Sequence, residues 1–174
     1  MKAEALAGIA RKCREAGHYE QVLEVTKSIG NAQLKEQVAA EIASACAQAG
    51  SYDQALAVAK SIGRILFQTN ALTEIARKYA EAGQYGQALQ TAKTIPIATS
   101  KASLLAEIAG KCAEAGQKEK AAEILFQALL VVKTAEDASA EAEALAVIGF
   151  QYAKAGQPVD DKAKQILHEI IAGL

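Results

Sequence analysis

The amino-acid sequence predicts an all-α protein: a right-handed αα-superhelix, or solenoid, of five helix-turn-helix repeats and about ten helices. Alanine, the strongest helix former, supplies 40 of the 174 residues, whereas the aromatic residues that favour strands make up only 5%. Ala-Gly pairs recur with glycine spacings of 33, 33, 33 and 40 residues. Apolar residues lie at helical spacing on both sides of each pair, which is typical of stacked helical hairpins. The glycines are Gly17, Gly50, Gly83, Gly116 and Gly156.

The first helix of each repeat is expected to end at the Ala-Gly pair. A helix commonly ends on a residue in the left-handed conformation, which only glycine adopts without a steric penalty. A similar helical block precedes each glycine, such as Ala40-Glu41-Ile42-Ala43 in the second unit. The expected first helices lie near residues 3–16, 33–49, 66–82, 99–115 and 138–155.

The second helix of each repeat is expected to follow the glycine turn. Ser51, with Gln54 three residues later, is a capping-box pattern for the second helix of unit two. Breaking segments such as Thr94-Ile95-Pro96 separate the units, because proline has no amide hydrogen with which to continue a helix. The expected second helices lie near residues 19–29, 52–62, 85–95, 118–133 and 160–172.

The five units are predicted to form one domain over residues 1–174. The last glycine spacing contains seven extra residues, which are expected to lengthen the second helix of unit four and its exit, roughly from Ala121 to Glu136. The unit boundaries are expected at about 1–31, 32–64, 65–97, 98–136 and 137–174.

Composition and charge exclude several classes of protein. The net charge is −1, from 19 basic and 20 acidic residues, so nucleic acid is not an expected partner. The longest strongly apolar stretch, residues 124–132, is far shorter than the about 20 residues of a membrane span, and no secretory signal is recognisable at the start. Three cysteines, an odd number, argue against a disulfide framework. The expected location is therefore the cytoplasm, without membrane contact.

At the level of single positions, the chain resembles the tetratricopeptide repeat family. The matching residues are Leu6, Ile9-Ala10 and Gly17-His18-Tyr19 in unit one, and Leu72, Ile75-Ala76, Gly83-Gln84-Tyr85 and Ala88 in unit three. The period is one residue shorter than the family's 34, and Pro158 replaces the turn tyrosine in unit five. The resemblance implies a scaffold for protein partners, and it names no particular function.

No residue pattern indicates catalysis, a metal or a cofactor. Cys13, Cys46 and Cys112 occupy one repeat position, so they cannot all converge on a zinc ion at about 2.3 Å and are expected to pack in the core. His18 and His168 lack a nearby nucleophile or orienting acid. The chain is expected to be non-catalytic, with no cofactor.

Charged and polar residues recur on the first helices. A solvated, self-compensating face explains many of them, since pairs three or four residues apart stabilise a helix by roughly 0.2 to 0.5 kcal/mol. The resemblance implies instead a concave groove that holds a partner peptide or helix. The candidate groove residues are Glu4, Arg11, Arg14, Gln37, Ser44, Gln48, Asn70, Thr73, Arg77, Glu81, Ser103, Glu114, Phe150 and Lys154.

Two functions follow as hypotheses. The first is a protein-protein interaction scaffold or adaptor that binds its partner in the concave groove. The alternative is a structural, self-assembling solenoid that forms homo-oligomers through its terminal helices, or a segment of a longer repeat array. The alternative rests on the apolar last helix, with Ile166, Leu167, Ile170, Ile171 and Leu174, because solenoids normally need polar caps.

Overall fold

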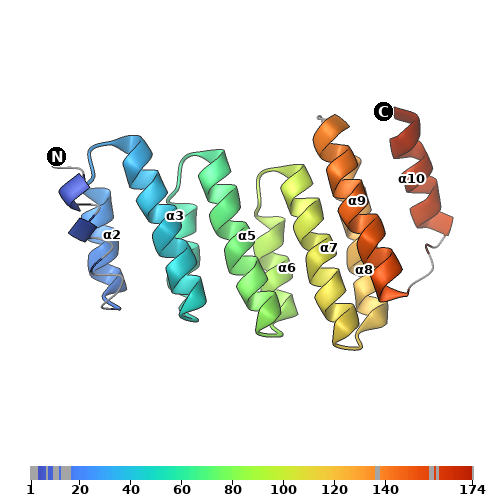
Figure 1. Cartoon of the computed structure of the whole chain (residues 1–174), viewed down its shortest axis with the longest axis horizontal. Helices are drawn as coiled ribbons and strands as arrows, with labels where there is room; N and C mark the ends of the chain where they lie inside the picture. The colour runs from blue at the N-terminus through green and yellow to red at the C-terminus, as the bar shows by residue number, and fades with distance from the viewer. Residues whose placement is uncertain are drawn as a thin grey trace. The chain divides into compact units, whose positions relative to one another are not determined.

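The computed structural model describes residues 4–6, 8, 9, 12, 17–135, 138–156, 159 and 161–173 (Figure 1). All regular structure in these residues is helical, which confirms the predicted all-α class. Helical residues also precede the first bounded helix, at 4–6, 8, 9 and 12. The bounded helices are α2 (Tyr19–Lys27), α3 (Ala32–Gln48), α4 (Tyr52–Lys60), α5 (Ile65–Glu81), α6 (Tyr85–Lys93), α7 (Ala98–Glu114), α8 (Lys118–Val132), α9 (Ala138–Ala155) and α10 (Asp161–Gly173).

The chain divides into two compact units, Met1–Lys78 and Tyr79–Leu174, and the division falls within α5. In the first unit α3 packs against both α2 and α4. In the second unit α7 packs against α6, α8 and α9, and α8 also contacts α10. A hairpin repeat makes its contacts with sequence neighbours, and both units follow this rule. The single five-repeat domain stays a prediction.

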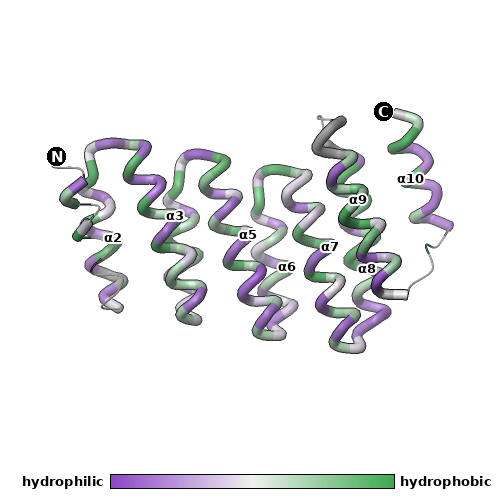
Figure 2. The backbone as a smooth tube through the Cα atoms, viewed as in Figure 1, coloured by the Kyte–Doolittle hydropathy of each residue, from purple (hydrophilic) through white to green (hydrophobic). Residues whose placement is uncertain are grey.

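The first helices of the repeats match their predicted positions closely. Helices α3, α5 and α7 each have 17 residues, and their first residues are 33 apart along the chain. The side chain of Asn31 starts α3, because its Oδ1 accepts a hydrogen bond of 2.9 Å from the main-chain N–H of Leu34. Figure 2 shows hydrophobic and hydrophilic residues alternating along these helices, as expected for helices with one buried side.

The glycine turns confirm the predicted ends of the first helices. Gly17, Gly50, Gly83, Gly116 and Gly156 all have positive φ, between 60° and 80°. After α5, the N–H of Gln84 donates to the Tyr79 oxygen at 2.8 Å, and the N–H of Gly83 donates to the Ala80 oxygen at 3.1 Å. This pair of hydrogen bonds is a Schellman motif, which satisfies carbonyls that a helix end leaves unpaired.

The second helices of the first three repeats end two residues earlier than predicted. Helices α2, α4 and α6 have nine residues each and end at Lys27, Lys60 and Lys93. The next residue is a serine or threonine whose hydroxyl donates to the preceding turn, as in the 2.7 Å bond from Ser61 to the Val58 oxygen. The isoleucine that follows, such as Ile62, is 3% exposed and belongs to the core. Local side-chain bonds therefore end the helix before the glycine or proline does.

The predicted capping box at Ser51 is wrong. Its side chain makes no capping hydrogen bond to α4, and its ψ of 62° is not extended. The main-chain N–H of Ser51 instead donates to the Cys46 oxygen at 2.8 Å and closes the glycine turn. The turn thus holds Ser51 in a conformation unlike that of a capping residue.

The predicted lengthening of the second helix in unit four is confirmed. Helix α8 has 15 residues, whereas α2, α4 and α6 have nine. Residues 136 and 137, at the predicted end of this stretch, lie outside the described residues. The longer helix buries an apolar row of Ile124, Leu125, Ala128, Leu129 and Val132.

Isoleucine and alanine at fixed repeat positions fill the core. Ile42, Ile75, Ile108 and Ile148 are each 1% exposed or less. Cys46 and Cys112 are 0% exposed, which confirms their predicted place in the core, and Cys13 lies outside the described residues. No helix in the described part of the chain is long and apolar enough to cross a lipid bilayer.

Candidate partner-binding surface

The candidate groove residues recur at equivalent sequence positions, because the first helices α3, α5 and α7 share one length and one spacing along the chain. Gln37, Asn70 and Ser103 are 33 residues apart and occupy one position on α3, α5 and α7. Gln48 and Glu81 stand near the ends of α3 and α5. Of the other candidates, Glu4 is exposed, and Arg11 and Arg14 lie outside the described residues.

In the first compact unit the candidates on α3 and α5 are uncharged and polar, apart from Arg77. The side chains of Gln37, Gln48 and Asn70 are exposed, while Ser44, Thr73 and Arg77 are half-buried. The Nε2 group of Gln37 donates to Glu41 Oε1 at 3.4 Å, one turn further along α3. Amide and hydroxyl groups both donate and accept hydrogen bonds, so this part of the surface suits a polar or main-chain ligand.

In the second compact unit two candidates pair with each other. Lys154 Nζ on α9 lies 2.6 Å from Glu114 Oε1 on α7. The hydrogen bond and charge of Lys154 hold the pKa of the Glu114 carboxyl below its ordinary value. Beside the pair lies a hollow of about 210 Å³, which Gly110, Ala113 and Lys118 also line. Much of the charge that the sequence offers at these two positions is therefore neutralised within the protein.

Gly110 belongs to a contact that the sequence analysis missed. A Cβ atom at Gly110 would lie 2.2 Å from Gln151 Oε1, so the Gln151 side chain needs the space that the glycine leaves. The same repeat position holds Ser44 in α3 and Arg77 in α5. In α7 this position is thus used for packing against α9 and offers no side chain to a ligand.

Phe150 is the one large apolar residue among the candidates. Its side chain stands on α9 and is 65% exposed. Ile171 on α10 is 64% exposed. Ile166 and Ile170 of the same helix are buried, so α10 packs with one side and leaves Ile171 uncovered. Exposed large apolar side chains mark surfaces that bind other molecules when they gather in a patch.

Among the described residues, Cys46, Cys112 and the two histidines show no reactive arrangement. Burial raises the pKa of the Cys46 thiol to about 11 and also raises that of Cys112, so both thiols stay protonated at neutral pH. The side chains of His18 and His168 are exposed. Within the residues that the structure describes, no group of three or more histidine, cysteine, aspartate or glutamate residues is placed to hold a metal ion.

Repeated hairpins, left-handed turn glycines and turn tyrosines make the chain an α-helical repeat protein built from helix-turn-helix units. No family model and no curated protein matches the chain. Two similar solved structures are of a Podosopora anserina putative kinesin light chain with nearly identical TPR-like repeats, one of them with a substitution. The substituted form is 16% identical over 97% of this chain and 92% of that one, with a TM-score of 0.41. The other is 17% identical over 99% and 95%, with a TM-score of 0.41.

Proposed function

We propose that this chain is a non-catalytic scaffold or adaptor that binds a peptide or helix of a partner protein along its first helices. One observation carries the proposal: core positions repeat faithfully, whereas a surface position on the same helices does not. Ile42, Ile75 and Ile108 are equivalent and buried. Their neighbours Ser44 and Arg77 share one position and differ completely in chemistry. Packing accounts for the constant positions, and the changing chemistry of Ser44 and Arg77 at the variable position supports recognition of a ligand there.

The character of the surface in the first unit defines the expected partner. The amides of Gln37, Gln48 and Asn70 are exposed and can donate and accept hydrogen bonds together. A partner segment with exposed main-chain groups or polar side chains would suit them. A reducing, cytoplasmic location is part of the proposal, because Cys46 and Cys112 are free thiols.

Photo-crosslinking tests this function. A photoreactive amino acid at Gln37 or Asn70, on the first helices, is expected to capture a defined protein from lysate of the source cell. The matched controls place it at Gln54 or Gln87, exposed glutamines on second helices. A partner captured equally from both sets, or from the controls alone, would contradict binding along the first helices.

Self-assembly is the second candidate function, and the exposed side chains of Phe150 and Ile171 favour it. Two apolar side chains that are each about two thirds exposed would be covered if the ends of two copies met. Light scattering across a wide range of protein concentration tests this. A molar mass above that of one chain, reduced in a Phe150→Ser, Ile171→Ser variant, would support assembly, and a constant monomer mass would exclude it.

A further inference from the structure

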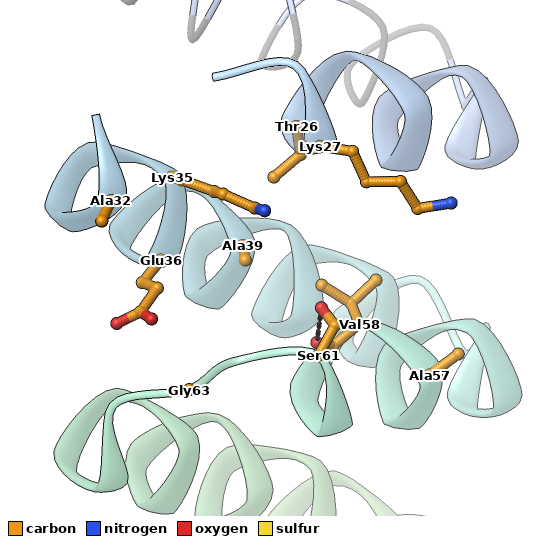
Figure 3. Close-up of a pocket in the computed structure, with 10 residues that line it drawn as sticks. All are labelled: Thr26, Lys27, Ala32, Lys35, Glu36, Ala39, Ala57, Val58, Ser61 and Gly63. Atoms are coloured by element: carbon orange, nitrogen blue, oxygen red, sulfur yellow. Dashed lines mark hydrogen bonds between the residues drawn. The ribbon is translucent and has the colours of Figure 1, made fainter. Parts of the chain in front are cut away.

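A pocket of about 450 Å³ lies in the first compact unit, among the end of α2, the first half of α3 and the end of α4 (Figure 3). Pockets that bind small molecules commonly have volumes of about 300 to 1,000 Å³. None of the candidate groove residues contributes to this pocket. The lining residues are Thr26, Lys27, Ala32, Lys35, Glu36, Ala39, Ala57, Val58, Ser61 and Gly63.

The pocket is open where Ala39 replaces a larger residue. The equivalent positions in the other four units all carry leucine, as Leu6, Leu72, Leu105 and Leu145. Leu72 and Leu105 are 2% and 3% exposed, so leucine at this position is a core residue. Ala39 instead leaves a gap where a leucine side chain would stand, and the wall there is apolar.

Lys35 brings a positive charge to this apolar space. Figure 3 shows its side chain extending away from Glu36 and toward the space between Thr26 and Ala39. Within the described part of the chain, no carboxylate forms an ion pair with the Lys35 ammonium. This ammonium is therefore available to an anion.

The other charges at the pocket are already paired. The ammonium of Lys27 lies 2.7 Å from Glu24 Oε1. Glu36 Oε2 lies 3.4 Å from Arg64 Nε, and the Glu36 carboxylate points to the loop at Gly63. A Cβ atom at Gly63 would come to 3.0 Å from Glu36 Oε1, so the glycine leaves room for this arrangement. Glu36 Oε2 is buried and accepts no hydrogen bond, so Arg64 alone balances its charge, whereas the Lys35 ammonium has no carboxylate partner in the described part of the chain.

We propose that this pocket binds an aliphatic carboxylate. The hydrocarbon part of the ligand packs against Ala39, Ala57 and Val58, and the carboxylate accepts a hydrogen bond from the Lys35 ammonium. The binding free energy at such a site comes from burial of the apolar part of the ligand and from one charge-assisted hydrogen bond. The proposal goes beyond the scaffold function, because none of the pocket residues belongs to the candidate groove residues.

NMR titration of the full chain tests the proposal with 4-methylpentanoate as the probe. The methyl signals of Val58, Ala39 and Ala57 are expected to shift and to saturate. The neutral 4-methylpentanamide, of nearly the same shape, is expected to bind roughly three to five times more weakly, as the loss of a partly exposed ion pair implies. An absence of saturable shifts, or equal affinity for acid and amide, would overturn the proposal.

Two variants separate the pocket from general surface binding. Ala39→Leu restores the residue of the other repeats and fills the space, so the Val58 shifts are expected to vanish while the helical signal and Tm are kept. Lys35→Gln is expected to abolish the preference for the acid over the amide. Lys101→Gln, at the same repeat position of α7, is the matched control and is expected to change nothing.

Wild-type affinity in Ala39→Leu would overturn the proposal. If Ala39→Leu fails to fold, the substitution Lys35→Gln at a half-buried position decides the question alone, and a retained preference for the acid would then contradict the proposal. A peptide that ends in leucine with a free carboxylate identifies the source of the ligand. Equal Val58 shifts with the peptide would assign the carboxylate to the end of a partner chain, and binding of the free acid alone would assign it to a small molecule.

Discussion

The hydroxyl group of Tyr85 donates a hydrogen bond of 3.1 Å to the main-chain oxygen of Lys111, 26 residues further along the chain. Tyr52 makes the same bond to the oxygen of Lys78, at 3.3 Å and the same separation of 26 residues. In both cases the turn tyrosine of one repeat reaches the first helix of the next repeat. The turn tyrosines Tyr52 and Tyr85 thus link neighbouring hairpins.

Replacing Tyr85 by phenylalanine is expected to destabilise the protein. The substitution removes the hydrogen bond to Lys111 and keeps an aromatic ring under the Lys120 ammonium, which lies 5.6 Å from the ring centroid. Loss of one such bond corresponds to about 1 kcal/mol in the free energy of unfolding. Urea denaturation measures this loss, and Tyr52→Phe should reproduce it. A Tyr85→Phe protein as stable as the wild type would show that the bond contributes nothing.

Alanine is expected to have opposite effects at two nearby glycines. Gly83 has a φ of 72°, so Gly83→Ala forces a side chain into the left-handed region and should destabilise by about 1 to 2 kcal/mol. Gly86 lies inside α6, and a Cβ atom there would meet nothing within 4 Å. Gly86→Ala should be neutral or stabilise by up to about 1 kcal/mol, because alanine favours helix. Thermal unfolding of both variants checks the contrast, and equal destabilisation would refute it.

The Cys46 thiol is expected to resist alkylation in the folded protein. Burial raises its pKa to about 11, so little thiolate forms at pH 8. Because the folded pKa lies above the unfolded value, the contribution of this thiol to folding stability should be constant below about pH 9 and should fall as the pH rises toward 11. Peptide-resolved iodoacetamide labelling with and without urea measures the protection. Rapid native labelling of Cys46 would contradict its burial.

The pKa of Glu114 is expected to rise when Lys154 is removed. Lys154 lowers this pKa through a hydrogen bond and its charge, and the Glu114 side chain is about half exposed. The ion pair therefore stabilises the folded protein at pH values above the pKa that glutamate has in the unfolded chain. This stabilisation is lost as the pH falls through the lower pKa of Glu114 in the folded protein. Carbon NMR titration of Glu114 in Lys154→Gln should show the increase, which high salt should reduce in size. An unchanged titration would mean that the ion pair does not persist in solution.

Local sequence signals predicted the repeat well. The positions of α3, α5 and α7 follow from apolar spacing and from the Ala-Gly pairs, since helix periodicity and left-handed glycine are properties of a few adjacent residues. The greater length of α8 followed from the wider glycine spacing. The sequence did not show which of two competing local hydrogen bonds would form at a helix end. Ser51 has the pattern of a cap, yet its N–H serves the turn instead.

The sequence by itself determined the all-α class, the 33-residue hairpin and the burial of Cys46 and Cys112, because each depends on helix propensity and spacing along the chain. Only the tertiary structure decided which side chains meet across helices. The pairing of Glu114 with Lys154 joins residues 40 apart, and Lys35 gains its place beside an apolar space through packing of α2, α3 and α4. Such contacts depend on the register between helices, which no local pattern records.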